Sequence, residues 1–449
     1  MPSPADAGGP EVREWYAPGA HNLAPLHGLI NLDQINQSIP MAPTPTPADL
    51  LTAAETCQAL GISQATLYAY VSRGLIESRP GADHRSRLYL REDVERLAQR
   101  KRAGRGAARG AAQSLDRGLP VLETRISLIR PDGPYYRGCS AVEAVREGAT
   151  LEDIARLLWD CGDSDPFALP FDTRWPDAVA AIASDDALPP LVRAMSALPL
   201  LALDARPSQP GGATVRHAIA ANLLRHNAAL LVASTPRDVP VHRLLAECWR
   251  PGDEAFADLI RGALVLCAEH ELNVSAFAAR VVASTGAHLH ATVCSGLAAL
   301  SGPRHGGATA RAHALIDAAC TAHSARDFIA DRWQRGDDLP GFGHALYPHG
   351  DPRAAELLTR LRAVHAASPH WRRLENVIAA TEDINGLKPN VDFTLAAICH
   401  AYRLPAAPAL IMFAAGRLSG WLAHAMEQQA QGRLIRPRAS YAGELPGKP

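Results

Sequence analysis

Residues 302–307 read GPRHGG, residues 340–344 read PGFGH, and residues 351–353 read DPR. In the first two segments a histidine stands beside glycines, which let a backbone approach a ligand closely because they carry no side chain. Further along, residues 390–393 read NVDF and supply a carboxylate just before a helical pattern. Two histidines and an aspartate on loops beside helix starts are groups that enzymes use to move protons. Together the segments predict a catalytic site built from loops.

The composition favours a mainly α protein and excludes any function that depends on a strong overall charge. The chain has 449 residues, which is enough for more than one domain. Aromatic residues make up only 5% of it, and alanine, leucine and arginine dominate, which favours helices over sheets. The 45 basic and 46 acidic residues nearly cancel. The net charge therefore does not indicate a nucleic-acid or membrane partner, and any electrostatic function must be local.

Cysteine and histidine usage predicts a cytoplasmic protein without a metal or cofactor. The eight cysteines are scattered and form no Cys-x-x-Cys pair, which is typical of reduced thiols. His288 and His290 lack the spacing of a zinc motif, so we interpret them as packing or capping residues. No Gly-x-Gly-x-x-Gly indicates a nicotinamide cofactor. No apolar run reaches the roughly 20 residues that span a membrane, and the N-terminus lacks a signal pattern.

The N-terminal part divides into an arm, a small domain and a linker. Residues 1–48 contain alternating prolines and little apolar periodicity, so we expect a disordered arm. Residues 49–100 form a compact unit that opens with a capping box, Thr52 with Glu55, on a helix ending near Gly61. Residues 101–115 are basic and glycine-rich, which predicts a flexible linker. The body of the protein follows at 116–449.

The compact unit carries features of a DNA-binding domain. After a second helix, capped by Ser63 and stopping at Gly74, apolar residues 75–76 and 88–90 flank a polar turn and predict a wing. This pattern resembles the winged helix-turn-helix of the MerR and excisionase families. The candidate DNA contacts lie on the second helix and in the wing; they are Gln64, Thr66, Tyr68, Arg73, Arg85 and Arg87. A domain used only for assembly remains an equal alternative.

The motifs of the body resemble, in the same order, those of the citrate synthase family. Besides the loops quoted above, the resemblance includes YRG at 136–138, EHELNVSAFAARVVAST at 269–285, GRLSGWLAH at 416–424 and RPR at 436–438. It runs from about Leu119 to Glu444. It implies a two-domain helical fold, with a large subdomain of residues 116–306 and 404–449 and a small subdomain of about 307–403.

The resemblance also implies the reaction and the roles of the residues. Citrate synthases join the methyl carbon of acetyl-CoA to the ketone carbon of oxaloacetate and then hydrolyse the thioester. By resemblance Asp392 is the base, His305 donates to the thioester oxygen, and His344 protonates or polarises the ketone. The family's oxaloacetate-binding positions are occupied by His270, Arg353, Arg417 and Arg436. A place in the tricarboxylic acid cycle and a homodimer or higher oligomer are implied as well, with Arg436 reaching into the partner's site.

The local sequence makes the role of His305 plausible. A helical pattern follows it, and the dipole at a helix N-terminus holds a histidine neutral, so that it donates a hydrogen bond without becoming a cation. Gly306 and Gly307 are expected to leave room for an acyl-CoA.

Departures from the family pattern leave other functions open. Thr309 and Ala310 stand where the family commonly has Asn-Glu or Asn-Gln, and residues 345–350 lack a basic residue that often helps to hold CoA phosphate. The choice between acetyl-CoA and propionyl-CoA, and so between citrate and 2-methylcitrate, is therefore open. One alternative is a DNA-binding regulator that uses the body as a metabolite sensor, and another is a citryl-CoA lyase-like enzyme.

Overall fold

The computed structural model describes residues 50–64, 67, 71, 76, 78–80, 87–91, 93–94, 122–204, 212–437 and 443. The chain divides into two compact units, Met1–Leu119 and Pro120–Pro449. The arm expected at residues 1–48 and the linker expected at 101–115 lie outside the described residues.

The first unit contains a small antiparallel sheet beside a capped helix. Strands β1 (Leu50–Thr52), β2 (Ser78–Pro80) and β3 (Arg87–Leu90) pair in the order β1-β3-β2, and α1 (Ala53–Leu60) follows β1. The predicted capping box is confirmed: Thr52 N–H donates to Glu55 Oε2 over 2.8 Å, and Glu55 N–H returns a bond to Thr52 Oγ1 over 3.3 Å. Gly61 ends α1 in the left-handed conformation, φ 60°, as expected.

The sequence predicted a wing flanked by the apolar residues 75–76 and 88–90. The strand that pairs with β3 is Ser78–Pro80, just after the first apolar pair, and Arg79 in it pairs with Leu88. Ile76 instead belongs to the small core of this unit and is only 1% exposed. The apolar side chain at position 76 indicated a core residue and not a strand. The strand at 78–80 is mostly polar, so no apolar pattern marked it. Strand β1 was not predicted.

The second unit begins with a sheet and continues as helices. Strands β4 (Ser127–Arg130), β5 (Gly133–Tyr136) and β6 (Cys139–Ser140) pair antiparallel in the order β4-β5-β6. The helical elements are, in chain order, α4 (Ala141–Arg146), α5 (Leu151–Trp159), the 3₁₀ turn η3 (Pro166–Ala168), α6 (Asp177–Ala183), α7 (Pro190–Asp204), α8 (Ala213–Leu231), α9 (Val241–Trp249), α10 (Glu254–Cys267), α11 (Val274–Ala283), α12 (Leu289–Leu300), α13 (Gly307–Thr321), α14 (Ala325–Gln334), α15 (Pro352–His365), α16 (Pro369–Asn385), α17 (Val391–Ala401) and α18 (Ala407–Gln431).

Many of these helices start where a side chain accepts a free backbone N–H, which is what the first turn of a helix requires. This confirms His288 as a capping residue, because its Nδ1 accepts the N–H of Ala291 over 3.3 Å. The capping side chains are those of Ser140, Thr150, Asp253, Asn273, His288, Ser324, Asp351, Ser368 and Asn390.

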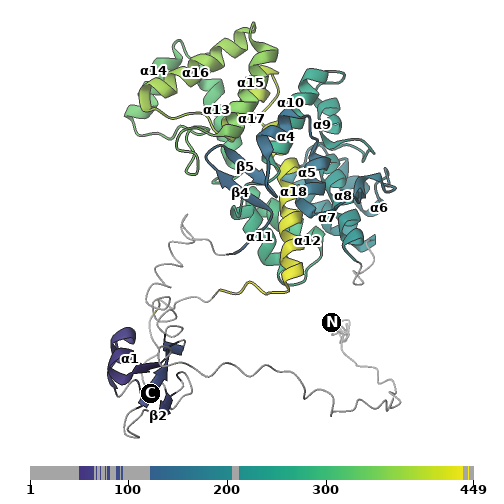
Figure 1. The fold of residues 1–449 in the computed structure, drawn as a ribbon. Coiled ribbons are helices and arrows are strands. Elements are labelled where there is room, and N and C mark those ends of the chain that lie inside the picture. The colour runs from purple at the N-terminus through teal and green to yellow at the C-terminus, as the bar shows by residue number, and fades with distance from the viewer. Residues whose placement is uncertain are drawn as a thin grey trace, which may run out of the picture. The chain divides into compact units, whose positions relative to one another are not determined.

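Within the second unit, helices α13 to α17 form one group, and the other helices of this unit form another (Figure 1). The first group covers residues 307–401, close to the range assigned to the small subdomain from the sequence. Helix α18, 25 residues long, runs through the second group and packs against α5, α8, α10, α11 and α12. It also contacts α17, so that it joins the two groups. The predicted mainly helical fold is confirmed.

Glycines on α18 allow it to pack closely against the end of α10. A Cβ added at Gly416 would lie 2.6 Å from Leu264 O. One added at Gly420 would lie 2.1 Å from Glu269 Oε2 and 2.5 Å from Ala268 O. The N–H of Gly420 donates to the same Ala268 carbonyl over 3.2 Å. At these positions only glycine permits the observed backbone separation, since real side chains do not approach so closely.

We expect Gly420→Ala to lower the free energy of unfolding by about 1–3 kcal/mol, because the methyl group overpacks a buried contact. Urea unfolding of both proteins measures the difference. Gly212→Ala is the control, since its methyl group would meet no atom within 4 Å. If Gly420→Ala were as stable as the control, the close packing of α18 on the end of α10 would be contradicted.

Candidate active site

The structure brings the predicted histidines together with Asp392, Arg353 and Arg417 at the ends of several elements. His270 lies between α10 and α11, and His305 lies just before α13. His344 is on the loop between α14 and α15, while Arg353 and Asp392 stand in the first turns of α15 and α17. Arg417 lies within α18.

Arg436 does not lie among these site residues. It follows α18 and is exposed. Its neighbour Ile435 donates its N–H to Ser284 Oγ over 3.1 Å. Among the described residues, Arg436 forms no hydrogen bond or ion pair with the other predicted site residues.

His270 and His344 form an aromatic cluster with Tyr347. The rings of His270 and His344 meet edge to face with centroids 5.3 Å apart. His270 Nε2 is hydrogen-bonded to the hydroxyl of Tyr347 over 3.0 Å. Burial, together with the charges of Arg353 and Arg417, holds the pKa of His270 well below its usual value. His270 is therefore a neutral hydrogen-bonding group at neutral pH.

Arg353 is held by a buried carboxylate, Asp351. Arg353 is 2% exposed and Asp351 is 3% exposed. Arg353 Nε donates to Oδ1 over 3.0 Å, and Nη2 donates to Oδ2 over 2.8 Å. Burial disfavours both charges, but their mutual attraction and hydrogen bonds outweigh it, lowering the pKa of Asp351 and raising the pKa of Arg353. Asp351 Oδ2 also accepts the N–H of Val391 over 3.1 Å, which ties α15 to α17.

His344 accepts a hydrogen bond through Nδ1, to which the backbone N–H of Leu346 donates over 3.1 Å. Its Nε2 lies 3.4 Å from Arg353 Nη2, at the edge of hydrogen-bonding distance. Because a guanidinium only donates, Nε2 carries a proton only where this contact is not a hydrogen bond. The Nε2 side of His344 faces the buried guanidinium, where an anionic ligand would bind.

The loop of His344 is attached to the loop of Asp392. Gly343 N–H donates to Lys388 O over 2.8 Å, and Asn390 N–H donates to Gly341 O over 2.9 Å. The side chain of Asn390 adds a bond to Gly343 O over 2.9 Å. Gly341 has φ +92°, and a Cβ there would lie 2.9 Å from that of Phe393. These contacts fix the acid and the base of the predicted pair relative to each other.

Asp392 is a carboxyl group with a raised pKa. Burial raises the pKa of Asp392 to about 6, although the charge of Arg353 opposes the shift. The sequence placed Asp392 just before the helix, whereas it lies inside the first turn of α17, after the capping residue Asn390. A pKa near neutrality makes this carboxylate a stronger base than an exposed aspartate, while leaving it ionised at pH 7.

His305 has a lowered pKa, as expected for a neutral histidine. Burial lowers the pKa of His305 to about 4, and the charge of Arg417 contributes. Gly306 is also required by the fold. A Cβ there would lie 2.4 Å from Leu300 O. Close packing of the chain is therefore one reason for glycine at this position, and room for an acyl-CoA stays a prediction.

Ser275 holds His305 in place. Its hydroxyl lies 2.8 Å from His305 Nε2, 2.8 Å from Asn273 Oδ1 and 3.1 Å from Trp421 Nε1, which donates to it. The single hydroxyl proton has two acceptors. When it points to His305, the proton of the imidazole is on Nδ1, the nitrogen not bonded to Ser275.

Arg417 is buried without a direct carboxylate partner. It is 2% exposed, and its Nε donates to Cys267 O over 2.7 Å. Its guanidinium lies 4.6 Å above the ring of Phe413. Burial lowers the pKa of Arg417. Among the described residues no carboxylate forms an ion pair with it, so its charge is available to an anionic ligand.

Asp351, Ser275 and Tyr347 were not assigned a role from the sequence. Asp351 stands in the quoted DPR motif, and the Asp-Pro pair at a helix start is a recognisable capping signal. Ser275 and Tyr347 carry no local signal, because their roles arise from contacts with residues 30 and 77 positions away.

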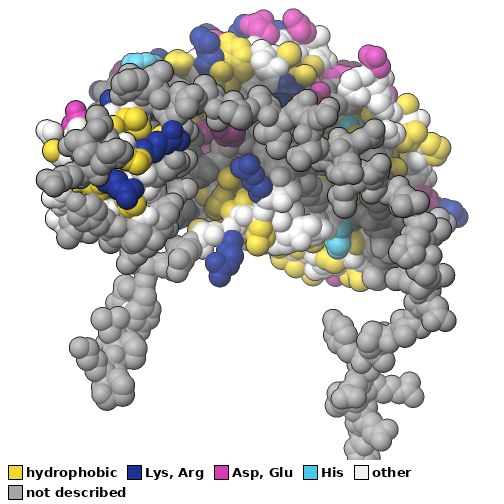
Figure 2. Space-filling view, turned by 60° about the horizontal axis from the view of Figure 1, so that its bottom comes forward, with side chains coloured by type: hydrophobic (Ala, Val, Ile, Leu, Met, Phe, Trp, Pro, Cys, Tyr) yellow, Lys and Arg dark blue, Asp and Glu magenta, His cyan; other side chains and the backbone are white. Residues whose placement is uncertain are grey.

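Of the candidate DNA contacts, Gln64 and Arg87 are described and exposed. Arg87 Nη1 donates to Ser78 Oγ over 3.3 Å, across the two paired strands. Thr66, Tyr68, Arg73 and Arg85 lie outside the described residues. On the face drawn in Figure 2, the acidic and basic side chains of the described residues stand at scattered positions.

Among the described residues, no group of histidine, cysteine, aspartate or glutamate side chains is arranged to bind a metal ion. Nor is any helix in the described part of the chain long and apolar enough to cross a membrane.

Residues 114–438 match the family described as "Citrate synthase, C-terminal domain". The chain belongs to the citrate synthase family. Residues 50–102 match a second family, the "Helix-turn-helix domain". Both resemblances noted in the sequence are thus confirmed, and the body is that of a citrate synthase-type enzyme.

The relatives that this chain resembles include proteins named citrate synthase and proteins named 2-methylcitrate synthase. A protein of Mycobacterium bovis (strain ATCC BAA-935 / AF2122/97) named "Putative citrate synthase 2" is 33% identical over 358 residues, covering 74% of this chain and 93% of the relative. A 2-methylcitrate synthase of Shewanella oneidensis is 39% identical over 189 residues, 41% of this chain and 50% of the relative. The citrate synthase of Thermoplasma acidophilum, solved with carboxymethyl coenzyme A and oxaloacetate, shares the fold. The two structures superpose with a TM-score of 0.62 at 23% sequence identity. The superposition covers 74% of this chain and 96% of the Thermoplasma chain.

Proposed function

We propose that the protein is a cytoplasmic enzyme that condenses acetyl-CoA or propionyl-CoA with oxaloacetate. Hydrolysis of the resulting thioester would release CoA and either citrate or 2-methylcitrate. The observation that carries this proposal is the position of Asp392. Its carboxyl group, with a pKa of about 6, is near two buried arginines and stands on a loop attached to His344. The acyl group remains open, since the names of the relatives include both citrate synthases and 2-methylcitrate synthases.

In the proposed first step, Asp392 removes a proton from the carbon next to the thioester. This carbon is a very weak acid, so the developing enolate oxygen must receive a hydrogen bond at the same moment. His305 supplies it from Nδ1, which requires the hydroxyl of Ser275 to donate to Nε2. Because burial lowers the pKa of His305 to about 4, its imidazole is uncharged at neutral pH and donates this bond as a neutral group.

In the proposed second step, the enolate carbon attacks the ketone carbon of oxaloacetate. Arg353, Arg417 and His270 would hold this dianion, and His344 would donate its Nε2 proton to the ketone oxygen. The charge of Arg353 is partly balanced by Asp351, whereas Arg417 has no such partner. We therefore assign the stronger attraction for a substrate carboxylate to Arg417.

We expect Asp392→Ala and His305→Ala each to reduce CoA release by about 10²–10⁴-fold, because each removes one proton-handling group. Oxaloacetate binding, measured by calorimetry, should persist because neither side chain is proposed to hold it. In the wild type, kcat should fall as the pH drops below about 6, where Asp392 becomes protonated. Asp383→Ala, in an exposed ion pair with Arg326, is the matched control. Turnover by Asp392→Ala near the wild-type rate would refute the mechanism.

We also propose a homodimer or higher oligomer in which Arg436 completes the partner's site. Its exposure and its lack of contact with the site of its own chain support this. Mixing Arg436→Ala subunits with Asp392→Ala subunits should restore CoA release in one of the two sites of each mixed dimer. Mixed dimers, isolated with two affinity tags, would be assayed beside each parent variant. Mixed dimers as inactive as their parents would rule out a shared site.

The helix-turn-helix match favours DNA binding as a second function. The alternatives of a metabolite-sensing regulator and of a citryl-CoA lyase-like enzyme would retain this domain too. A sensor would not need Asp392, which favours the enzyme. CoA release from citryl-CoA without oxaloacetate formation would separate the synthase from the lyase.

If the first unit binds DNA, affinity for a duplex should fall steeply with salt, by about 0.9 in log–log slope for each phosphate neutralised. Replacing Arg85 and Arg87 with alanine should flatten this slope and leave CoA release unchanged. Fluorescence anisotropy of a labelled duplex measures the affinity. A full-length protein that binds no duplex even at low salt would leave the unit with a role in assembly.

A further inference from the structure

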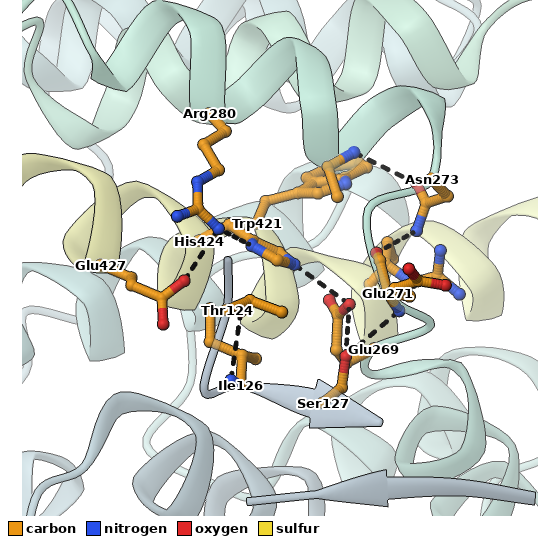
Figure 3. A network of polar contacts seen from close by, with 12 residues as sticks. Thr124, Ile126, Ser127, Glu269, Glu271, Asn273, Arg280, Trp421, His424 and Glu427 are labelled. Atoms are coloured by element: carbon orange, nitrogen blue, oxygen red, sulfur yellow. Dashed lines mark hydrogen bonds and ion pairs between the residues drawn. The ribbon is translucent and has the colours of Figure 1, made fainter. Parts of the chain in front are cut away.

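A buried carboxylate outside the proposed reaction lies directly beside His270. Glu269 is fully buried, between the end of α10 and the face of α18 that carries Gly420. Its Oε1 lies 3.2 Å from His424 Nε2 and 3.3 Å from Ser127 Oγ (Figure 3). Its backbone is fixed as well, because Tyr136 Oη donates to the carbonyl of Glu269 over 3.1 Å.

The hydrogen bonds to Glu269 have a defined direction. Arg280 only donates, so its Nη1 donates to His424 Nδ1 over 3.3 Å. The proton of neutral His424 is therefore on Nε2, from which it donates to Glu269 Oε1. Arg280 is itself held by Glu427 over 2.8 Å and by Gln428 over 2.7 Å. Figure 3 shows this series of contacts crossing from α11 through α18 to the loop after α10.

The same network holds the start of the body, residues 123–127, which we call the leading segment. Arg280 Nη2 donates to the carbonyl of Glu123 over 3.0 Å. Ser127 Oγ donates to Glu269 and also accepts the N–H of Glu271 over 3.2 Å. The leading segment is therefore bonded on one side to Arg280 and on the other to residues 269–275. These residues comprise the loop after α10 and the first two residues of α11, and we call them together the loop of residues 269–275.

This loop carries groups from both halves of the proposed reaction. His270 stands at one end, where it would contact oxaloacetate. Asn273 and Ser275 stand at the other, where Ser275 meets His305 Nε2 over 2.8 Å. A displacement of the loop would therefore move a substrate contact and the partner of a proton donor together. Misplacement of about 1 Å in such groups costs up to about 10²-fold in rate.

We propose that Glu269 is a positioning residue, which holds the loop of residues 269–275 in its active geometry through Ser127 and His424. The inference rests on the proposed function. A structural role alone does not account for a carboxylate here, because burying a charge is unfavourable and apolar residues of similar volume often stabilise a core more. Glu269 also supplies the negative charge that acts most strongly on Arg417, the proposed anion-binding arginine.

The test compares Glu269→Ala and Glu269→Gln with Glu152→Ala in the full-length protein. Glu152 is a suitable control because it is a half-buried glutamate on α5 whose Oε2 is buried. Its Oε1 accepts the N–H of Val241 over 2.8 Å away from the site. Three quantities are measured for each protein: stability to urea, the Kd for oxaloacetate by calorimetry, and kcat for CoA release.

We expect Glu269→Ala to raise the Kd for oxaloacetate and to lower kcat, each by about tenfold or more. Glu269→Gln should recover most of both, because its amide oxygen still accepts from Ser127 and His424. Glu152→Ala should lose stability yet keep the wild-type Kd and kcat. If Glu269→Ala loses stability like the control while Kd and kcat stay at wild-type values, the positioning role is overturned.

Two further measurements keep the test decisive. Should Glu269→Ala not fold, Ser127→Ala takes its place, and an unchanged Kd and kcat in that variant would overturn the proposal. Wild-type protein is assayed first with oxaloacetate and both acyl-CoA substrates. Absence of oxaloacetate binding in the wild type would refute the proposed function itself, and with it the inference, whereas a binding-competent wild type makes the variants informative about Glu269 alone.

Discussion

The buried ion pair between Asp351 and Arg353 is the interaction on which the geometry of the site depends. Asp351 caps α15 and accepts hydrogen bonds from Nε and Nη2 along one edge of the Arg353 guanidinium. It also accepts the first N–H of α17. One carboxylate therefore fixes two helix starts, one of which carries Asp392. Breaking such a pair leaves an uncompensated buried charge, which typically costs about 3–5 kcal/mol. The position of the proposed base and the charge of the arginine proposed to bind substrate thus depend on the same two side chains.

The burial that makes this pair costly to break also sets the protonation of its neighbours. Desolvation lowers the pKa values of His270 and His305, and Arg353 and Arg417 act in the same direction. Burial also raises the pKa of Asp392 to about 6, against the charges of Arg353 and Arg417. Neutral histidines donate hydrogen bonds, and a carboxylate of raised pKa accepts a proton more readily. Burial thus produces both kinds of group that the proposed chemistry needs.

Local signals in the sequence were enough to find the groups proposed to react, but not those that hold them. His305, His344 and Asp392 stand in short motifs beside glycines or a helix cap, and the capping box at Thr52 is equally local. Ser275, Tyr347 and Glu269 act on residues distant in the chain, so no pattern within a window of residues reveals them. The structural reason for Gly306 was missed as well, because its close approach to Leu300 O depends on how the chain folds back. The strand at Ser78–Pro80 was missed because it is polar.

Helix α18 connects these observations, because one of its faces performs several tasks at once. Arg417, Gly420, Trp421 and His424 follow the three- and four-residue spacing that places side chains on one side of a helix. Along that face lie the proposed anion-binding group, a close backbone contact, a donor to Ser275 and the donor to Glu269. A rotation or shift of α18 would disturb all four together. The glycine that lets α18 approach the end of α10 therefore belongs as much to the site as to the core.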